Sequence, residues 1–455
     1  MLYSKQIDIK ETYDAVICGG GFSGFAAAYS AAREGLQTVL IERGSSLGGV
    51  GTDGLVNHIL GERYYEDGKA KTCIAGLFAQ IEDALIQSGD GIDYHTVDLE
   101  LPPHGWKKSL GVGFIFDKDK MKLLLEQMLI GMGVHILYMT QIVDVIRQDG
   151  KLEGVIVHNK SGLYGIAGKY FVDATGDADI CAMAGLETHK GDESGGLAAA
   201  SLEMHIENVD WETLTAYMHT TGDVRFTKLI DDLKVRGIWH FPYEIFISVM
   251  LTKKDVFFIN TIRQVGIDGT DAHSLTQGIL QGRQECYELL QIAKAHFPGF
   301  QNATMRQIAP AIGIRETRRI VGEYTMTIED LLAGTSFDDS IALSGYGWDM
   351  PNPKNPSYQP FHGVVRKHRS TQIPYRCLVP KGISNLITVG RCISVEREAL
   401  GPVRVMAACI ATGEAAGIAT ALALAEDTAY NKVDTDTLRQ KIVAYGGLVD
   451  RQSIK

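Results

Sequence analysis

The sequence predicts an α/β fold in which a Rossmann-type nucleotide-binding domain, with a parallel sheet plus an antiparallel meander, carries an inserted α+β domain. Three observations support this prediction. A glycine-rich turn joins an apolar run to a helix near the start of the chain, alternating apolar strands follow, and a second glycine-rich strand-to-helix segment lies near the end. The 455 residues exceed the ~250–300 at which a single core stops growing, so more than one domain is expected.

The chain opens with a βαβ unit that ends at Glu42. Residues 15–18 form an apolar run that predicts a buried strand, residues 22–34 are small residues typical of a closely packed helix, and residues 38–41 predict a second strand. The agreement of strand, helix, second strand and terminal acid makes this unit more specific than a glycine-rich loop alone.

The turn inside this unit has the GxGxxG spacing, with Gly19, Gly21 and Gly24. In this pattern the first glycine permits a tight turn, the second lets the backbone approach a pyrophosphate, and the third lets helix and strand pack closely. The helix N-terminus offers unpaired N–H groups to the phosphates. Glu42, about 20 residues further on, is placed to accept hydrogen bonds from ribose hydroxyls. These features alone fit NAD as well as FAD.

A glycine-rich loop follows, with Gly48, Gly49 and Gly51 before Thr52. Such a loop lets the backbone lie against a flat ring or a phosphate, although an ordinary flexible turn has the same composition. Further on, Asp117 is a candidate N-cap for a helix over residues 118–131.

Strands predominate from Val134 onward and predict a short antiparallel meander, with Asp149 and Gly150 as a hairpin turn. The last of these strands, residues 170–174, runs into the sequence ATGDAD, which comprises Ala174, Thr175, Gly176, Asp177, Ala178 and Asp179. A small-residue turn with carboxylates at the carboxyl end of a strand is where open α/β sheets hold ligands. The alternative is a plain strand-to-helix turn in which an aspartate caps the helix.

The segment from Glu187 to about Thr371 mixes strands and helices and is rich in arginine. We expect Arg315, Arg318 and Arg319 to share part of a helical face. A second group follows at His362, Arg366, His368, Arg369 and Arg376. Such grouping in an acidic protein favours a bound anion or a developing enolate. Salt bridges to neighbouring carboxylates explain any single arginine equally well.

The end of the chain returns to nucleotide-domain character. A strand within residues 385–394 runs into Gly390 and Arg391, and Gly401 with Pro402 suits a helix start. A helix that opens here can aim its positive end at a flavin carbonyl, or it can be a packing helix without cofactor contact. The apolar stretch 405–425 is long enough for a membrane span, but its glutamate, glycines and alanines favour a helix packed inside a domain.

Composition excludes some partners and suggests a compartment. The formal net charge is −11 and no run of lysine and arginine occurs, which argues against a nucleic-acid partner. The seven cysteines are scattered without a CxxC pair, so we expect buried thiols in a reducing compartment, and we predict no metal site. The first residues lack the apolar core of a signal peptide, which predicts a cytoplasmic protein without a membrane segment. A homo-oligomer is one state that the sequence allows.

The chain resembles the large family of FAD-dependent oxidoreductases with a glutathione-reductase-type FAD-binding domain in the segments GGGFSG, LIER, GGVGT, VDATGDADICAMAG, GIRETRRI, IPYRCLVP, VGRCIS and ALGPVRVMAACIATGEAAG. The resemblance covers nearly the whole chain and implies FAD rather than NAD. Some flavoproteins carry a histidine between the positions of Glu42 and Thr52 that links covalently to the ring. This chain has none there, so noncovalent FAD is expected.

With this resemblance, the predicted cofactor-binding residues are Gly19, Gly21, Phe22, Ser23, Gly24, Glu42, Arg43, Gly48, Gly49, Gly51, Thr52, Ala174, Thr175, Gly176, Asp177, Gly390, Arg391, Gly401 and Val403. Many such flavoproteins have aspartate where this chain has Arg391. The predicted FAD-binding domain is discontinuous and comprises residues 1–60, 110–186 and 372–430. The predicted substrate domain comprises residues 61–109 and 187–371, and residues 431–455 form a C-terminal tail.

The predicted function is an FAD-dependent oxidoreductase that transfers a hydride between noncovalent FAD and a small polar or anionic metabolite. The predicted catalytic residues are Arg315, His362 and Arg404, with His362 as a general acid or base because its ordinary pKa is near neutrality. One alternative is a flavin-containing electron-transfer subunit that works with a partner protein. Another is a tRNA-modifying flavoprotein, which the acidic composition disfavours.

Overall fold

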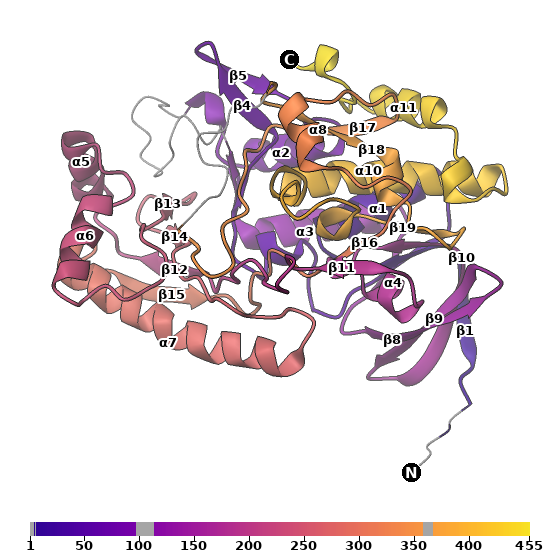
Figure 1. Ribbon diagram of the computed structural model, residues 1–455, viewed down its shortest axis with the longest axis horizontal. Helices are drawn as coiled ribbons and strands as arrows, with labels where there is room; N and C mark the ends of the chain where they lie inside the picture. Colours follow the sequence, from indigo (N-terminus) through magenta and orange to yellow (C-terminus); the bar gives the residue numbers. More distant parts are fainter. Residues whose placement is uncertain (1–3, 5, 97–112, 358–366) are drawn as a thin grey trace.

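The computed structural model describes residues 4, 6–96, 113–357 and 367–455 (Figure 1). Its centre is a seven-stranded sheet in the order β7-β2-β1-β10-β9-β8, with β19 paired to β10. The strands are β1 (Ile9–Cys18), β2 (Thr38–Ile41), β7 (His135–Leu137), β8 (Gln141–Gln148), β9 (Lys151–Asn159), β10 (Gly162–Asp173) and β19 (Leu386–Thr388). Five parallel strands end at one edge, since Cys18 pairs with Ile41 and with Asp173, Ile41 pairs with Leu137, and Asp173 pairs with Thr388. The predicted α/β fold is confirmed.

The antiparallel meander forms at the end of the sheet as predicted. β8 and β9 pair antiparallel, and β9 pairs antiparallel with β10. Asp149 and Gly150 form the turn, with φ of +48° and +76°, the left-handed geometry of a tight hairpin. The predicted strand after Val134 lies elsewhere, because β7 pairs parallel with β2. The long segment between β2 and β7 ends in a helix over residues 118–131, and a crossover of this kind leads to a parallel neighbour.

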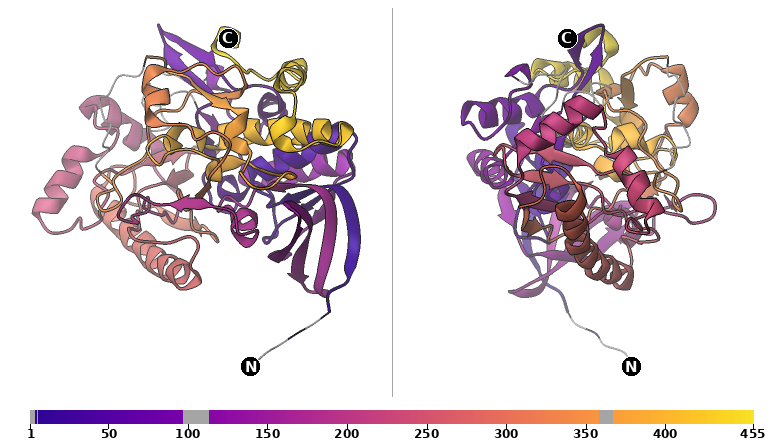
Figure 2. Two further views of the ribbon diagram at one scale, coloured as in Figure 1. Left: turned by 45° about the vertical axis from the view of Figure 1, so that its right-hand side comes forward. Right: turned by 90° about the vertical axis from the view of Figure 1, so that its left-hand side faces the viewer.

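Two helices far apart in sequence cover one face of the sheet. α1 (Phe22–Arg33) and α10 (Met406–Ala425) lie side by side over it (Figures 1 and 2). A Cβ atom on Gly413 would lie 2.2 Å from the Ser23 carbonyl oxygen, and one on Gly417 would lie 2.4 Å from that of Ala27. α10 is long and apolar enough to cross a membrane, but 83% of its most apolar stretch is buried inside the molecule. Its composition is therefore explained by this packing.

The opposite face of the sheet has its own core, because successive strand residues point to opposite sides. Ala15 and Ile17 pack with α1 and α10, whereas Val16 and Cys18 pack with residues of the meander. The helix α3 (Lys118–Gly131) has its predicted bounds, and its N-cap Asp117 accepts the N–H groups of the second and third residues after it.

A second body of structure stands beside the main sheet (Figure 2). It contains an antiparallel sheet in the order β13-β14-β12-β15 with a separate apolar core. Its elements are β12 (Met204–Glu207), α5 (Trp211–Thr221), α6 (Thr227–Val235), β13 (Ser248–Met250), β14 (Phe257–Ile259), α7 (Ala272–His296) and β15 (Thr304–Ile308). This is the inserted α+β unit that the sequence predicts.

The remaining helices and strands lie outside these two sheets. They are β3 (His58–Ile59), β4 (Arg63–Glu66), β5 (Lys69–Thr72), α2 (Leu77–Gln87), β6 (Phe114–Ile115), α4 (Asp179–Met183), β11 (Thr188–Lys190), β16 (Arg318–Ile320), α8 (Ile328–Ala333), β17 (Ser340–Ser344), β18 (Thr371–Pro374), α9 (Leu400–Val403) and α11 (Thr435–Ala444). Side chains of α2 and β17 belong to the same apolar core as those of α1 and α10. The domain boundaries stay a prediction. Six of the seven cysteines are buried and all seven are free, as expected.

Candidate functional site

The glycine turn lies at the edge where the parallel strands end. Gly19 has φ of +111°, and a Cβ atom there would lie 2.5 Å from the Ala174 carbonyl oxygen. A Cβ atom on Gly24 would lie 1.8 Å from the Gly19 carbonyl oxygen, so the helix starts in direct contact with the turn. Nothing lies within 4 Å of a Cβ atom on Gly21. No side chain caps α1, so the first N–H groups of this helix are available to a ligand.

The loop after β2 is fixed against this turn. Gly48 has φ of +92° and donates its N–H to the Gly20 carbonyl at 2.9 Å. The Thr52 hydroxyl donates to the Leu47 carbonyl at 2.6 Å. Gly51 is packed so closely that an added Cβ atom would lie 2.4 Å from the Phe22 ring and 2.9 Å from the Met406 sulfur. The loop is therefore held between the starts of α1 and α10, and it is not a flexible turn.

Glu42 ends β2 and directs its carboxylate back to the turn. The two carboxylate oxygens accept the N–H groups of Gly20 and Gly44, each at 2.6 Å. The next residue, Arg43, is exposed. The ribose contact of Glu42 stays a prediction, and the structure adds a second task, which is to orient the glycine turn.

Glu42→Ala is expected to weaken FAD binding about tenfold, since it removes one acceptor and leaves two N–H groups unpaired. Titration of the apoprotein with FAD, followed by quenching of flavin fluorescence, measures this change. Glu153→Ala, on the exposed side of β9 in the meander, is the control and should bind FAD like the parent chain. Equal affinity in Glu42→Ala would contradict the assignment.

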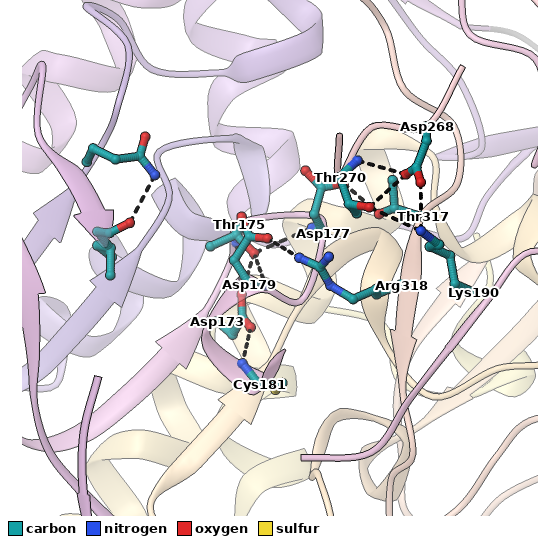
Figure 3. A network of polar contacts seen from close by, with 12 residues as sticks. Asp173, Thr175, Asp177, Asp179, Cys181, Lys190, Asp268, Thr270, Thr317 and Arg318 are labelled. Atoms are coloured by element: carbon teal, nitrogen blue, oxygen red, sulfur yellow. Dashed lines mark hydrogen bonds and ion pairs between the residues drawn. The ribbon is translucent and has the colours of Figure 1, made fainter. Parts of the chain in front are cut away.

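Carboxylates gather at the end of β10 (Figure 3). Asp173 accepts the Thr175 hydroxyl at 2.7 Å and the Cys181 N–H at 3.1 Å, which shapes the turn into α4. Asp177 accepts the Thr317 hydroxyl at 2.6 Å. A plain helix cap does not describe Asp177, because its side chain reaches across to a different segment.

Arg391 pairs with the same carboxylate. Its guanidinium donates to Asp177 at 2.5 Å and lies against Gly176, where a Cβ atom would come within 3.0 Å of it. Burial raises the pKa of Asp177, but the charge of Arg391 and the Thr317 hydroxyl outweigh this effect and hold the pKa below its usual value. The arginine that replaces the family's usual aspartate thus has its own acid partner. The FAD contacts predicted for Gly390 and Arg391 stay predictions.

A helix starts at the predicted position of Gly401 and Pro402, but it is short. Leu400–Val403 forms the helix α9, and Val405 then adopts an extended backbone before the long helix α10 begins at Met406. Gly401 packs closely against another segment, because a Cβ atom there would lie 2.8 Å from the Asp349 nitrogen. Val403 is fully buried. α10 has no side-chain cap, so its first N–H groups are free to meet a ligand.

These features fit FAD. Two uncapped helix starts, a turn with open space beside Gly21 and a glycine loop between them lie at the common edge of the parallel strands. The residues that would hold the pyrophosphate are those of the glycine turn. Those that would approach the flavin are the loop 48–52 and the start of α10.

The prediction that Arg315, Arg318 and Arg319 share a helical face is wrong. Arg318–Ile320 is the strand β16, which pairs antiparallel with β11, and pairing between distant segments overrides a local pattern of this length. Arg318 forms an ion pair with Asp179, and Arg319 forms one with Glu316 at 2.8 Å. Salt bridging therefore explains these two arginines.

Arg315 points instead into a group of arginines that we call the arginine cluster. It comprises Arg225, Arg263, Arg315 and Arg404. The Ser201 hydroxyl accepts from Arg263 at 2.8 Å and from Arg315 at 2.6 Å. Arg404 donates to the Asp349 carboxylate at 2.9 Å. The structure thus brings the predicted residues Arg315 and Arg404 together, whereas His362 and Arg366 lie outside the described residues.

The environment of the cluster is desolvated and cationic. Burial, followed by the charges of Arg263 and Arg404, lowers the pKa of Arg315 to about 9. Burial alone would raise the pKa of Asp349, but these arginines hold it below its usual value. The Asp349 side chain is nevertheless 36% exposed, so solvent reaches the cluster.

A buried acid that the sequence analysis missed lies beside the cluster. Glu203 is 1% exposed, and one of its carboxylate oxygens has no hydrogen-bond partner. Burial raises its pKa from the ordinary 4.5 to about 7, against the opposing charges of Arg263 and Arg315. Neither Glu203 nor Arg225 stands in a motif. Arg263 follows the end of a strand, and this position is the one feature of the sequence that could have indicated a site residue.

Comparison with known proteins gives a family and several distant relatives. The model of the family described as FAD dependent oxidoreductase matches residues 14–442. A digeranylgeranylglycerophospholipid reductase of Thermoplasma volcanium is 27% identical over 181 residues, which are 39% of this chain and 43% of the relative. Digeranylgeranylglycerophospholipid reductase 1 of Methanococcoides burtonii is 25% identical over 40% of this chain and 42% of its own length. The match thus spans less than half of these relatives.

Two solved structures illustrate the likeness in fold. A geranylgeranyl bacteriochlorophyll reductase-like protein of Thermoplasma acidophilum has a TM-score of 0.47 at 14% identity, with 96% of this chain and 84% of that chain covered. A flavin-dependent brominase has a TM-score of 0.49 at 13% identity, with coverage of 94% and 83%.

Proposed function

This chain belongs to the family of FAD-dependent oxidoreductases, and from that premise we propose that it transfers a hydride between noncovalent FAD and a small anionic metabolite held by the arginine cluster. FAD supplies the two-electron chemistry when bound. The residues of the chain bind the anion, orient it and restrict the access of water.

The observation that carries the proposal is the charge of the arginine cluster. Among the described residues, Arg225, Arg263 and Arg315 form no ion pair, and Arg404 alone has a carboxylate partner. Two carboxylates, Glu203 and Asp349, act on this cluster of four guanidiniums, and grouped guanidiniums that outnumber their counterions are costly away from bulk water. A ligand that brings oxyanions into the cluster removes this cost, which supports an anionic substrate.

Its position supports the proposal as well. Arg404 lies directly between α9 and the uncapped start of α10, where the flavin is expected, while Arg225 and Arg263 come from the inserted body. An anion bound by Arg404 and Arg315 is therefore oriented at the junction of the two bodies. Positioning of this kind is a large part of what a protein contributes to hydride transfer.

The test is anaerobic mixing of the yellow holoprotein with small anionic metabolites, with bleaching of the flavin absorbance as the signal. Arg315→Met should raise the substrate concentration for half-maximal bleaching about 10–150-fold, since a charge-assisted hydrogen bond contributes about 1.5–3 kcal/mol. Its thermal stability should stay equal or rise, because repulsion within the cluster is relieved.

The matched control is Arg306→Met, which removes an arginine from an exposed ion pair with Glu207 on the inserted sheet. It should leave bleaching unchanged. If Arg315→Met binds anions as well as the parent chain, or unfolds at a lower temperature without any loss of affinity, the cluster is structural and the proposal fails.

No observation favours the electron-transfer alternative. Within the described ranges, no group of three or more His, Cys, Asp and Glu side chains is arranged to hold a metal ion, and the cysteines are mostly buried singly. Reduction of the flavin by a small anion, with no second protein present, distinguishes the two functions.

A further inference from the structure

We propose that Arg225 and Arg263, together with Tyr243, form a second anion subsite in the arginine cluster, so that the substrate is a small organic dianion. One oxyanion group binds at Arg315 and Arg404, and the other at Arg225 and Arg263. This inference rests on the proposed function, because it specifies the substrate class of the same site.

The cluster is a row. The arginine charge that acts on Arg225 comes from Arg263, and the charges that act on Arg315 come from Arg263 and Arg404. Ser201 joins the two middle members, since its hydroxyl accepts from both Arg263 and Arg315. The row therefore runs from Arg225, just before α6 of the inserted body, to Arg404 beside α10.

The two ends of the row differ in their counterions. Arg404 is paired with Asp349, whereas Arg225 has no hydrogen bond or ion pair through its side chain with any described residue. The groups that act on Arg225 besides Arg263 are the phenols of Tyr243 and Tyr346, and no carboxylate is among them. The Arg225 end thus has the larger unbalanced positive charge.

Donors for an oxyanion are arranged at that end. The Arg263 guanidinium lies over the Tyr243 ring, 4.4 Å from its centre, which fixes the plane of the guanidinium. The Tyr243 hydroxyl forms no hydrogen bond with the described residues, and Arg225 and Tyr243 are both partly exposed. Two guanidiniums and a phenol are suited to one carboxylate or phosphate group.

A purely structural role does not account for this arrangement. Buried arginines that stabilise a fold have carboxylate partners, as Arg319 and Arg397 both have in Glu316. Glu203 and Asp349 are the carboxylates that act on Arg315, and neither is among the groups that act on Arg225. The Arg225 end is left for an acid that arrives with the ligand.

The experiment measures binding of simple anions to the holoprotein at constant ionic strength, by flavin difference spectra and calorimetry. The probes are acetate, the dicarboxylates malonate, succinate and glutarate, and phosphonoacetate. At least one dianion should bind ten or more times more tightly than acetate. Preference for a dicarboxylate or for phosphonoacetate identifies the second group as carboxylate or phosphate, and either result supports the dianion.

The decisive variant is Arg225→Gln. It should reduce affinity for the preferred dianion to the level of acetate and change acetate affinity less than twofold. Arg225→Lys should keep part of the preference, which separates loss of charge from misfolding. The control Arg236→Gln alters an exposed arginine at the other end of α6, paired with Asp232, and should change nothing.

Failure of the second subsite and failure of the proposed function would give different binding results. If the parent chain binds acetate and every dianion equally, or if Arg225→Gln weakens both kinds of anion equally, the second subsite is wrong while the proposed function stands. If Arg315→Met leaves acetate and dianion binding unchanged, the proposed function itself fails.

Discussion

Gly24→Val is expected to abolish FAD binding and to destabilise the fold by several kcal/mol, the largest effect predicted for a single substitution in this chain. A Cβ atom at this position would lie 1.8 Å from the Gly19 carbonyl oxygen, 2.9 Å from its carbon and 3.0 Å from the Ala174 Cβ. The Gly19 backbone and Ala174, at the buried end of a strand, cannot move away from the added side chain unless α1 shifts away from the sheet. Thermal unfolding of the apoprotein and the ratio of flavin to protein absorbance measure the two losses.

Gly21→Ala is the matched control for this prediction. Gly21 has φ of −63°, which any residue adopts, and nothing lies within 4 Å of the added Cβ atom. The apoprotein should therefore unfold at the temperature of the parent chain, while FAD binding weakens because the methyl group stands where the pyrophosphate is expected. A Gly24→Val protein that remains yellow and stable would contradict the close packing of helix and turn.

The glycine turn and the strand ends beside it could be predicted from the sequence, because each depends on residues that lie close together in the chain. The spacing of Gly19, Gly21 and Gly24 encodes one turn, and the following strand and acid lie within a single βαβ unit. The strand that ends at Asp173 is recognisable in the same way. Parallel pairing then brings such strand ends to one edge, so local predictions are enough to place these turns next to one another.

The arginine cluster could be predicted only in part, because contacts between distant segments of the chain bring its members together. Arg225, Arg263, Arg315 and Arg404 come from four separate segments, and packing of the inserted sheet against the nucleotide-binding body brings them together. Arg315 and Arg404 stand in family-like segments and could be proposed. Arg225 and Arg263 have no motif, and the arginines next to Arg315 pointed to a helix that the pairing of β16 with β11 replaces.

Glu203 could not be predicted from the sequence, since an isolated glutamate before a strand belongs to no motif. Its burial in the folded chain raises the pKa of its carboxyl group. Its pKa of about 7 in the folded chain exceeds the ordinary 4.5 of an unfolded one. Between these values the folded chain keeps the proton and the unfolded chain releases it. The stabilising effect of the protonated acid is therefore fully present below about pH 4.5 and is lost as the pH rises to about 7. At 1.36 kcal/mol per pKa unit, the loss is roughly 3 kcal/mol.

Glu203→Gln keeps the shape of the protonated acid at every pH, so its stability relative to the parent chain is expected to rise from less than about 1 kcal/mol near pH 5 to roughly 3 kcal/mol at pH 8. The measured quantity is the difference in unfolding temperature between the variant and the parent chain, followed from pH 5 to pH 8. Glu62 also has a pKa raised by burial, to about 8, but it is present in both proteins and cancels in this difference. A difference that stays constant across this range, or a variant that is less stable at pH 8, would show that Glu203 is ionised and is needed as the counterion of Arg263 and Arg315. A difference that grows with pH would instead mean that Glu203 carries less than one full negative charge at neutral pH. More of the positive charge of the arginine cluster is then left for the anion that binds there.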